Sequence, residues 1–142
     1  MNGEQKVTRA IERANQLVRR YLTAGLGELA VSEVEAHLLA RMAARGPCSV
    51  GDLQKAFAMR PSTLTNALDR LESRRFLVRR SDPKDRRTFV LELTAAGGRA
   101  AADVVSLVDA LERRVGERVS ARQLASFHAV IAALEGALDD RA

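Results

Sequence analysis

Residues 49–94 read SVGDLQKAFAMRPSTLTNALDRLESRRFLVRRSDPKDRRTFVLELT, and this stretch decides the fold. Its first half carries apolar residues at steps of three and four, as short amphipathic helices do. Its second half alternates apolar and polar residues on either side of a charged turn, as a β-hairpin does. Two short helices followed by an arginine-rich hairpin predict a module that reads DNA.

The first of these helices is predicted to begin after Ser49. The Ser49 side chain can cap the first backbone amides, and Asp52 follows three residues later, which is the spacing of a capping box. We expect the apolar residues Val50, Leu53 and Phe57 to form the inner face of this helix. A three-residue turn, 58–60, then leads into the next helix.

The second helix is predicted over residues 61–74. Pro61 suits the first helical position because its missing N–H costs nothing there, although the Arg60-Pro61 junction leaves open which side chain caps the helix. One side of this helix carries leucines, and the other carries six polar residues: Ser62, Thr63, Thr65, Asn66, Asp69 and Arg70. A tight turn before such a helix matches helix-turn-helix geometry, with this helix as the reading helix.

The polar face of the reading helix suggests specific contacts. Asn66 can read adenine, and Arg70 can read guanine or contact a phosphate. Small hydroxyl residues such as Ser62, Thr63 and Thr65 would let the helix lie close to the floor of the groove. The alternative is that some of these side chains are ordinary exposed helix residues that touch nothing.

The hairpin is predicted from strands at 76–80 and 88–93, joined by the polar turn Ser81-Asp82-Pro83-Lys84-Asp85-Arg86. A hairpin directly after a reading helix is the wing of a winged helix. Its basic tip has the size to enter a minor groove, where a narrow groove favours arginine. Because a carboxylate facing phosphate would repel it, we expect Asp85 to hold the guanidinium of Arg87 by a bidentate ion pair.

Positive charge is concentrated in this part of the chain. Residues 41–91 contain twelve Lys or Arg and five acids, a net charge of +7. Residues 1–40 are neutral, with five bases and five acids, and residues 92–142 are acidic, with six bases and eight acids. Clustered basic residues indicate a polyanionic partner, with a merely solvated basic face as the alternative.

The flanks have helical periodicity. Toward the N-terminus we expect a helix over about 4–23, ended by Gly25 and Gly27. A second helix is predicted to begin at Ser32, with Glu35 completing a capping box, and to stop at Gly46-Pro47.

Two further helices are predicted toward the C-terminus. Thr94 can cap one that ends at Gly116, and Ser120 can cap the next. Their apolar residues recur at heptad-like steps: Val104, Val108, Leu111 and Val115 in the first, and Leu124, Phe127, Ile131, Leu134 and Leu138 in the second. A monomer core can show the same pattern, but a second copy of the chain is the favoured partner for such seams.

The chain resembles the MarR family of bacterial regulators. The family's wing pattern of Asp, any residue, Arg, five residues and Leu-Thr stands here as Asp85, Arg87, Leu93 and Thr94, preceded by Asp82-Pro83. The order of predicted elements matches over nearly the whole chain. The resemblance implies a mainly α fold with a small β-hairpin wing: a winged helix-turn-helix domain plus a helical dimerisation domain formed by the N- and C-terminal helices.

The resemblance also implies that different parts of the chain have different functions. Residues 1–30 and 95–142 would form the dimer, and residues 31–94 would bind double-stranded DNA, with Arg87 in the minor groove and the reading helix in the major groove. Together with the basic tip of the hairpin, this predicts the following DNA-binding residues: Ser62, Thr63, Thr65, Asn66, Arg70, Lys84, Asp85, Arg86 and Arg87. The implied function is that of a transcriptional regulator, a repressor that binds a pseudo-palindromic operator as a homodimer and responds to a small-molecule effector.

Enzymatic and metal-dependent functions are disfavoured. The chain has one cysteine, and its histidines, His37 and His128, lie far apart in the sequence, so no zinc site, other cofactor or catalytic centre is expected. Gly97-Gly98 lacks the lysine and third glycine of a phosphate loop. With neither a signal peptide nor an apolar run of membrane-spanning length, we expect a cytoplasmic protein without a membrane partner.

Cys48 leaves one alternative open. A branch of the MarR family senses oxidants through a cysteine in its first helix, but Cys48 lies between the second and third predicted helices. Structural burial is therefore favoured over redox sensing. The remaining alternatives are a winged-helix adaptor that contacts protein and does not bind DNA, and a thiol enzyme.

Overall fold

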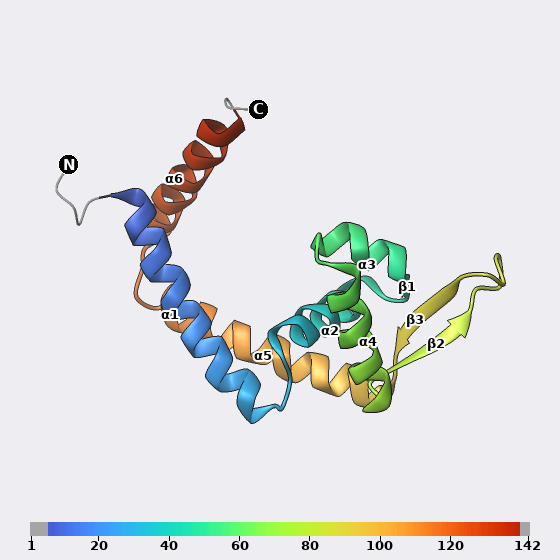
Figure 1. The fold of residues 1–142 in the computed structure, drawn as a ribbon. Coiled ribbons are helices and arrows are strands. Elements are labelled where there is room, and N and C mark those ends of the chain that lie inside the picture. Colours follow the sequence, from blue (N-terminus) through green and yellow to red (C-terminus); the bar gives the residue numbers. More distant parts are fainter. Residues whose placement is uncertain (1–5, 140–142) are drawn as a thin grey trace. The chain divides into compact units, whose positions relative to one another are not determined.

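The computed structural model describes residues 6–139. In the described part, the chain forms two compact units that meet in sequence between Val108 and Asp109. Figure 1 shows the elements in chain order: α1 (Val7–Glu28), α2 (Glu33–Arg45), β1 (Cys48–Ser49), α3 (Val50–Phe57), α4 (Pro61–Ser73), β2 (Leu77–Ser81), β3 (Phe89–Leu93), α5 (Ala95–Gly116) and α6 (Ala121–Asp139). The predicted fold class, mainly helical with a small β wing, is confirmed.

Helix α1 is longer than predicted, because Gly25 and Gly27 do not end it. A Cβ on Gly25 would lie 2.4 Å from Cδ1 of Leu107, so this glycine allows α1 to pack closely on α5. The helix ends where Ala30 takes a left-handed φ of 52° and the Val31 amide donates to the Leu26 carbonyl. Residues 4 and 5 of the predicted helix lie outside the described residues.

The predicted caps of α2 and α3 are confirmed. The Ser32 hydroxyl accepts from the Glu35 amide at 3.2 Å, and the Glu35 carboxylate accepts from the Ser32 amide at 3.0 Å. Ser49 and Asp52 form the same reciprocal pair at the start of α3. Such boxes satisfy two of the amides that a helix N-terminus leaves without partners.

The sheet contains a strand that the sequence did not indicate. Its order is β1-β3-β2, antiparallel throughout, so the predicted two-stranded wing becomes a three-stranded sheet. In β1, Cys48 pairs with Leu91 and Ser49 with Val90. Two residues directly before a helix carry no alternating pattern, and this is why β1 escaped prediction. The hairpin of β2 and β3 extends away from the helices of its unit (Figure 1).

Leucines form the core of the first unit. Eight of them are fully buried and come from helices α2, α3 and α4 and from the sheet: Leu38, Leu39, Leu53, Leu64, Leu68, Leu71, Leu77 and Leu91. Val50 was predicted to face inward but is 37% exposed, because it lies in the first turn of α3. The core holds α4 against α2 and thereby fixes which face of α4 remains in solvent.

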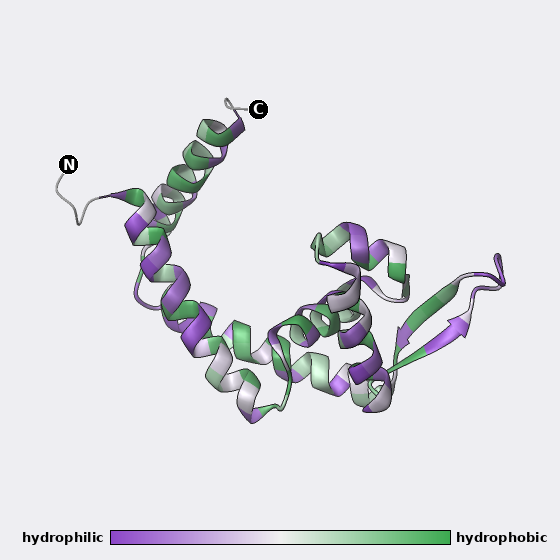
Figure 2. Cartoon of the chain, viewed as in Figure 1, coloured by the Kyte–Doolittle hydropathy of each residue, from purple (hydrophilic) through white to green (hydrophobic). Residues whose placement is uncertain are grey.

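The predicted caps of the last two helices are also confirmed. The Thr94 hydroxyl accepts from the Gly97 amide at 3.0 Å, and Ser120 forms a reciprocal pair with Gln123 at the start of α6. No residue of α6 is buried, and hydrophobic residues occur along the whole helix (Figure 2). The side chains of Leu124, Phe127, Val130 and Leu138 are exposed, and those of Ile131 and Leu134 are half-buried. The exposed seam of α6 is a surface that a further protein element can cover.

Candidate nucleic-acid interface

Helix α4 presents its polar face to solvent. The side chains of Ser62, Thr63, Thr65, Asn66 and Arg70 are all exposed, as is Asp69. The turn before α4 is held by the Gln54 amide group, which donates to the Met59 carbonyl at 2.5 Å. No side chain caps α4, so the question left open at Arg60-Pro61 is answered: Pro61 begins the helix, and its first amides receive no side-chain acceptor from the described residues.

The turn of the wing is organised by two aspartates. The Asp82 carboxylate accepts from the Lys84 amide at 2.8 Å, and the Asp85 carboxylate accepts from the Arg87 amide at 3.0 Å. Thr88 closes the turn by donating both its amide and its hydroxyl to the Asp85 carbonyl. These are Asx-type contacts, in which a short polar side chain replaces part of a backbone turn.

This arrangement corrects the predicted contact between Asp85 and Arg87. Within residues 6–139, no ion pair joins their side chains, and the Asp85 carboxylate instead accepts from the Arg87 backbone amide. Asp85 therefore fixes the path of the chain at Arg87 and leaves the guanidinium exposed. The side chains of Lys84 and Arg86 are exposed as well.

Arg79 of β2 connects the wing to the reading helix. Its guanidinium forms ion pairs with Asp69 and with Glu72, the latter at 3.0 Å from Nε. Both acids belong to α4, so the two parts of the candidate interface are cross-linked by charge. The pairing also partly neutralises the carboxylates that would otherwise repel a polyanion. Arg79 was not predicted as a site residue, because contacts between a helix and a later strand have no fixed spacing in the sequence.

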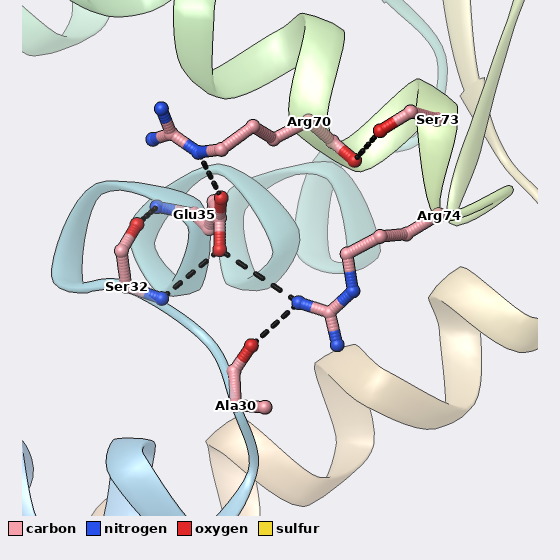
Figure 3. Close-up of polar contacts among 6 residues, drawn as sticks. All are labelled: Ala30, Ser32, Glu35, Arg70, Ser73 and Arg74. Carbon is pink, nitrogen blue, oxygen red and sulfur yellow. Dashed lines mark hydrogen bonds and ion pairs between the residues drawn. The ribbon is translucent and has the colours of Figure 1, made fainter.

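Glu35 is the centre of a polar network behind α4 (Figure 3). It is 4% exposed and is the only buried charged residue in the described part of the chain. Its Oε1 lies 2.6 Å from Nε of Arg70, and its Oε2 lies 3.9 Å from Nη1 of Arg74. The same Arg74 nitrogen donates to the Ala30 carbonyl at 2.5 Å. The network thus joins α4 to α2 and to the link between α1 and α2.

Arg70 was predicted to contact DNA, and the structure shows how its side chain is held. Its Nε is bound to Glu35, while the two terminal nitrogens point away from that carboxylate (Figure 3). The side chain remains 54% exposed. Ser62, Thr63, Thr65 and Asn66 have no such support from another element within the described residues.

The network should make folding stability depend on pH. Burial alone would raise the pKa of Glu35, but the Ser32 amide and the guanidinium groups of Arg70 and Arg74 outweigh it, and the pKa is lowered from 4.5. A carboxyl whose pKa is lower in the folded state stabilises the fold above its unfolded pKa and loses that contribution as the pH falls.

We therefore expect Glu35→Gln to cost about 1–3 kcal/mol of unfolding free energy at pH 7. The difference from wild type should shrink as the pH falls below the ordinary value of 4.5 and through the lowered pKa of Glu35, because the native carboxyl then becomes protonated. Urea unfolding at several pH values measures this. Glu33→Gln, at a neighbouring exposed glutamate, is the control. A Glu35→Gln deficit that does not change with pH would contradict the assigned role of the charge.

Cys48 lies half-buried in β1. Burial raises the pKa of its thiol, nearby Asp52 raises it further, and Arg41 opposes both with a smaller effect. A thiol with a raised pKa stays protonated at neutral pH, and the thiolate is the reactive form. This environment disfavours the alternative of redox sensing through Cys48.

The two histidines lie beside aromatic rings. His37 stacks on Phe57 with ring centroids 6.2 Å apart, and His128 meets Phe127 edge-on at 6.1 Å. In residues 6–139 no group of three or more His, Cys, Asp or Glu is arranged to hold a metal ion. The same residues include no helix that is both long enough and apolar enough to cross a membrane.

The chain is similar to a known protein family and to a curated protein. The MarR family model matches residues 31–89, the segment that contains the helix-turn-helix and most of the wing. The uncharacterized HTH-type transcriptional regulator YwhA of Bacillus subtilis is 32% identical over 104 residues, which cover 73% of this chain and 75% of YwhA.

Solved structures share the fold over almost the whole chain. A point mutant of MepR from S. aureus has a TM-score of 0.79 at 18% identity, covering 94% of this chain and 98% of MepR. The reduced form of MarR from E. coli has a TM-score of 0.75 at 23% identity, covering 91% and 96%. A third, another S. aureus MepR mutant that is bound to an oligodeoxyribonucleotide, has a TM-score of 0.66 at 19% identity, covering 94% and 98%. With the family match over residues 31–89, the curated relative and the six-helix fold in agreement, the chain belongs to the MarR family of transcriptional regulators.

Proposed function

We propose that the protein is a cytoplasmic repressor that binds a pseudo-palindromic operator as a homodimer and releases it when a small-molecule effector binds. The observation that carries the proposal is the pairing of two exposed surfaces in one unit. One is the polar face of α4, and the other is the turn with the exposed cations Lys84, Arg86 and Arg87. The structure of MepR with an oligodeoxyribonucleotide supports a DNA partner.

The proposed homodimer is supported by apolar side chains that the single chain leaves in solvent. On α6 these include Leu124 and Phe127, and on α1 they include Leu17 and Val18. We propose that residues 1–30 and 95–142 pair with the same segments of a second copy, while residues 31–94 bind DNA. A two-fold dimer would place two reading helices about one DNA turn, roughly 34 Å, apart.

The proposed effector response is supported by a cavity in the first unit. It measures about 280 Å³ and is lined by Phe76, which precedes β2, and by residues of the α1–α2 link and of α5, among them Leu29, Arg99 and Asp103. This volume lies near the lower end of the range for small-molecule pockets, and its lining mixes apolar side chains with two charges. A small charged aromatic or aliphatic molecule has the chemistry to occupy it.

Arg87→Ala tests the wing. We expect duplex affinity to fall roughly 10- to 100-fold, the size typical of one arginine contact with a groove, with unfolding unchanged because the side chain is exposed. The measurement is a salt titration of binding to duplexes selected from a random pool. Arg122→Ala removes the same charge from α6 and serves as the control.

The outcomes separate the alternatives. Wild-type affinity should decrease steeply with salt, with a slope of about 0.9 per neutralised phosphate on logarithmic axes. Equal loss from Arg87→Ala and Arg122→Ala would mean that only net charge matters, and the wing assignment would fail. A wild-type chain that binds no duplex at low salt would instead be the protein adaptor.

A further inference from the structure

We propose that Glu35 is a positioning residue for DNA binding, which holds the Nε of Arg70 so that the terminal nitrogens of that guanidinium face a phosphate of the bound duplex. This inference rests on the proposed function and adds a residue that does not itself touch DNA. It also assigns Arg70 one partner, the phosphate backbone, in place of a base.

The geometry of Arg70 favours a phosphate. In helix-turn-helix proteins, base edges are read mainly from the N-terminal part of the reading helix. Arg70 is the tenth residue of the thirteen in α4, and its side chain is drawn back onto α2 by Glu35. A guanidinium held there can reach the rim of the groove, where the backbone runs, and its two free terminal nitrogens match a phosphate oxygen pair.

The Glu35 carboxylate that holds Arg70 is itself held by other groups. Its Oε2 accepts from the Ser32 amide at 3.0 Å and faces Nη1 of Arg74 at 3.9 Å, which leaves Oε1 for Arg70. Arg74 is anchored in turn to the Ala30 carbonyl. A long, flexible arginine that is already oriented loses less conformational freedom when it binds, and preorganisation of this kind increases affinity.

The position of Glu35 in the chain supports a role beyond capping. A capping box requires only the Ser32 contact, and Asp52 of α3 performs the same task from an exposed position. Glu35 is buried and faces a cation of the reading helix, 35 residues later in the sequence. The carboxylate is thus placed where it controls a side chain at the candidate interface.

The direction in which Glu35→Gln changes duplex affinity shows whether Glu35 acts by positioning Arg70 or only by its negative charge. Removing an acidic group near DNA reduces repulsion and should increase affinity if charge alone matters. Positioning predicts the opposite for Glu35→Gln, because the amide no longer holds Arg70 by a charged pair. Glu33→Gln removes a carboxylate from the same turn of α2 without touching Arg70, and it is the matched control.

The experiment measures duplex affinity over a range of salt concentrations for wild type, Glu35→Gln, Arg70→Ala, the double variant, Arg70→Lys and Glu33→Gln. All measurements are made well below each variant's unfolding transition. We expect Arg70→Ala to weaken binding about tenfold on all sequences and to reduce the salt slope by about 0.9. Glu35→Gln should weaken binding about three- to tenfold, and the double variant should be no weaker than Arg70→Ala.

The Arg70→Lys variant keeps the positive charge of residue 70 and changes only the shape of the charged group. A lysine ammonium has a single nitrogen. It cannot donate to the Glu35 carboxylate and at the same time donate two parallel hydrogen bonds to a phosphate. We expect this variant to lose about as much affinity as Arg70→Ala. Glu33→Gln should bind as tightly as wild type or more tightly.

Three results would overturn the inference. They are a folded Glu35→Gln that binds as tightly as wild type, Arg70→Lys that binds as wild type does, and independent losses that multiply in the double variant. If any of these results is found while Arg87→Ala still weakens binding, the proposed function stands and only the role of Glu35 is rejected. Absence of duplex binding by the wild type would remove both.

Discussion

Replacement of Gly97 by alanine is expected to destabilise the first unit by about 3 kcal/mol or more, the upper range for forcing one extra carbon into a packed site. A Cβ at this position would lie 1.8 Å from the Phe76 carbonyl oxygen and 2.7 Å from its carbon. Both atoms belong to the backbone, so no rotamer change can relieve the overlap. The start of α5 would have to move away from the strand that leads into the wing.

The Phe76 carbonyl cannot easily move away from an added Cβ, because it already accepts a hydrogen bond. It accepts from the Thr94 amide at 3.0 Å, next to the Thr94 hydroxyl that donates to the Arg75 carbonyl at 2.6 Å. Thr94 also caps α5 through the Gly97 amide. One extra carbon would therefore disturb the helix cap and the end of the hairpin together.

Gly98→Ala is the matched control, one residue further along the same helix. Nothing lies within 4 Å of a Cβ there, and alanine in a helix is favoured over glycine by roughly 0.5–1 kcal/mol. Thermal unfolding should therefore show opposite shifts for two neighbouring substitutions, with a fall of roughly 10 °C for Gly97→Ala and a small rise for Gly98→Ala. Similar stabilities for the two variants would show that α5 is not held against Phe76.

The sequence predicted the features that depend on local spacing. The capping boxes at Ser32 and Ser49, the three-residue turn before Pro61 and the stop at Gly46 were all found, because each depends on residues within one helical turn of one another. The leucines of α4 were assigned to the core for the same reason. Local rules suffice where the partners lie close in the chain.

Features that depend on distant partners were missed or misread. Gly25 was read as a helix stop, whereas it makes room for Leu107, 82 residues later in the sequence. Glu35 was identified as a cap, but its ion pair with Arg70 depends on how α4 packs on α2. At the wing, Asp85 was predicted to orient Arg87, and the structure moves the contact from the guanidinium to the backbone amide.

The apolar residues along α6 lead to a second prediction with a large expected effect, on the dimer. Leu134→Asp is expected to dissociate the proposed homodimer, lowering the association constant more than roughly 100-fold, because an unpaired carboxylate in an apolar interface costs several kcal/mol. Light scattering and sedimentation measure the change in mass. DNA affinity should fall at least about tenfold, because two linked half-site contacts become two separate ones.

No residue of α6 is buried within the single chain, so a substitution there removes no contact from the core of the monomer. The variant should therefore keep its helical circular dichroism, which separates dissociation from unfolding. Ala132→Asp is the control, since at about 100° per residue it lies on roughly the opposite side of α6 and is exposed. If the Leu134→Asp chain retained the mass of a dimer, residue 134 would lie outside the interface. If the wild type were already a monomer at micromolar concentration, the seam would need a different partner, and the fixed spacing of two reading helices would have to come from the DNA alone.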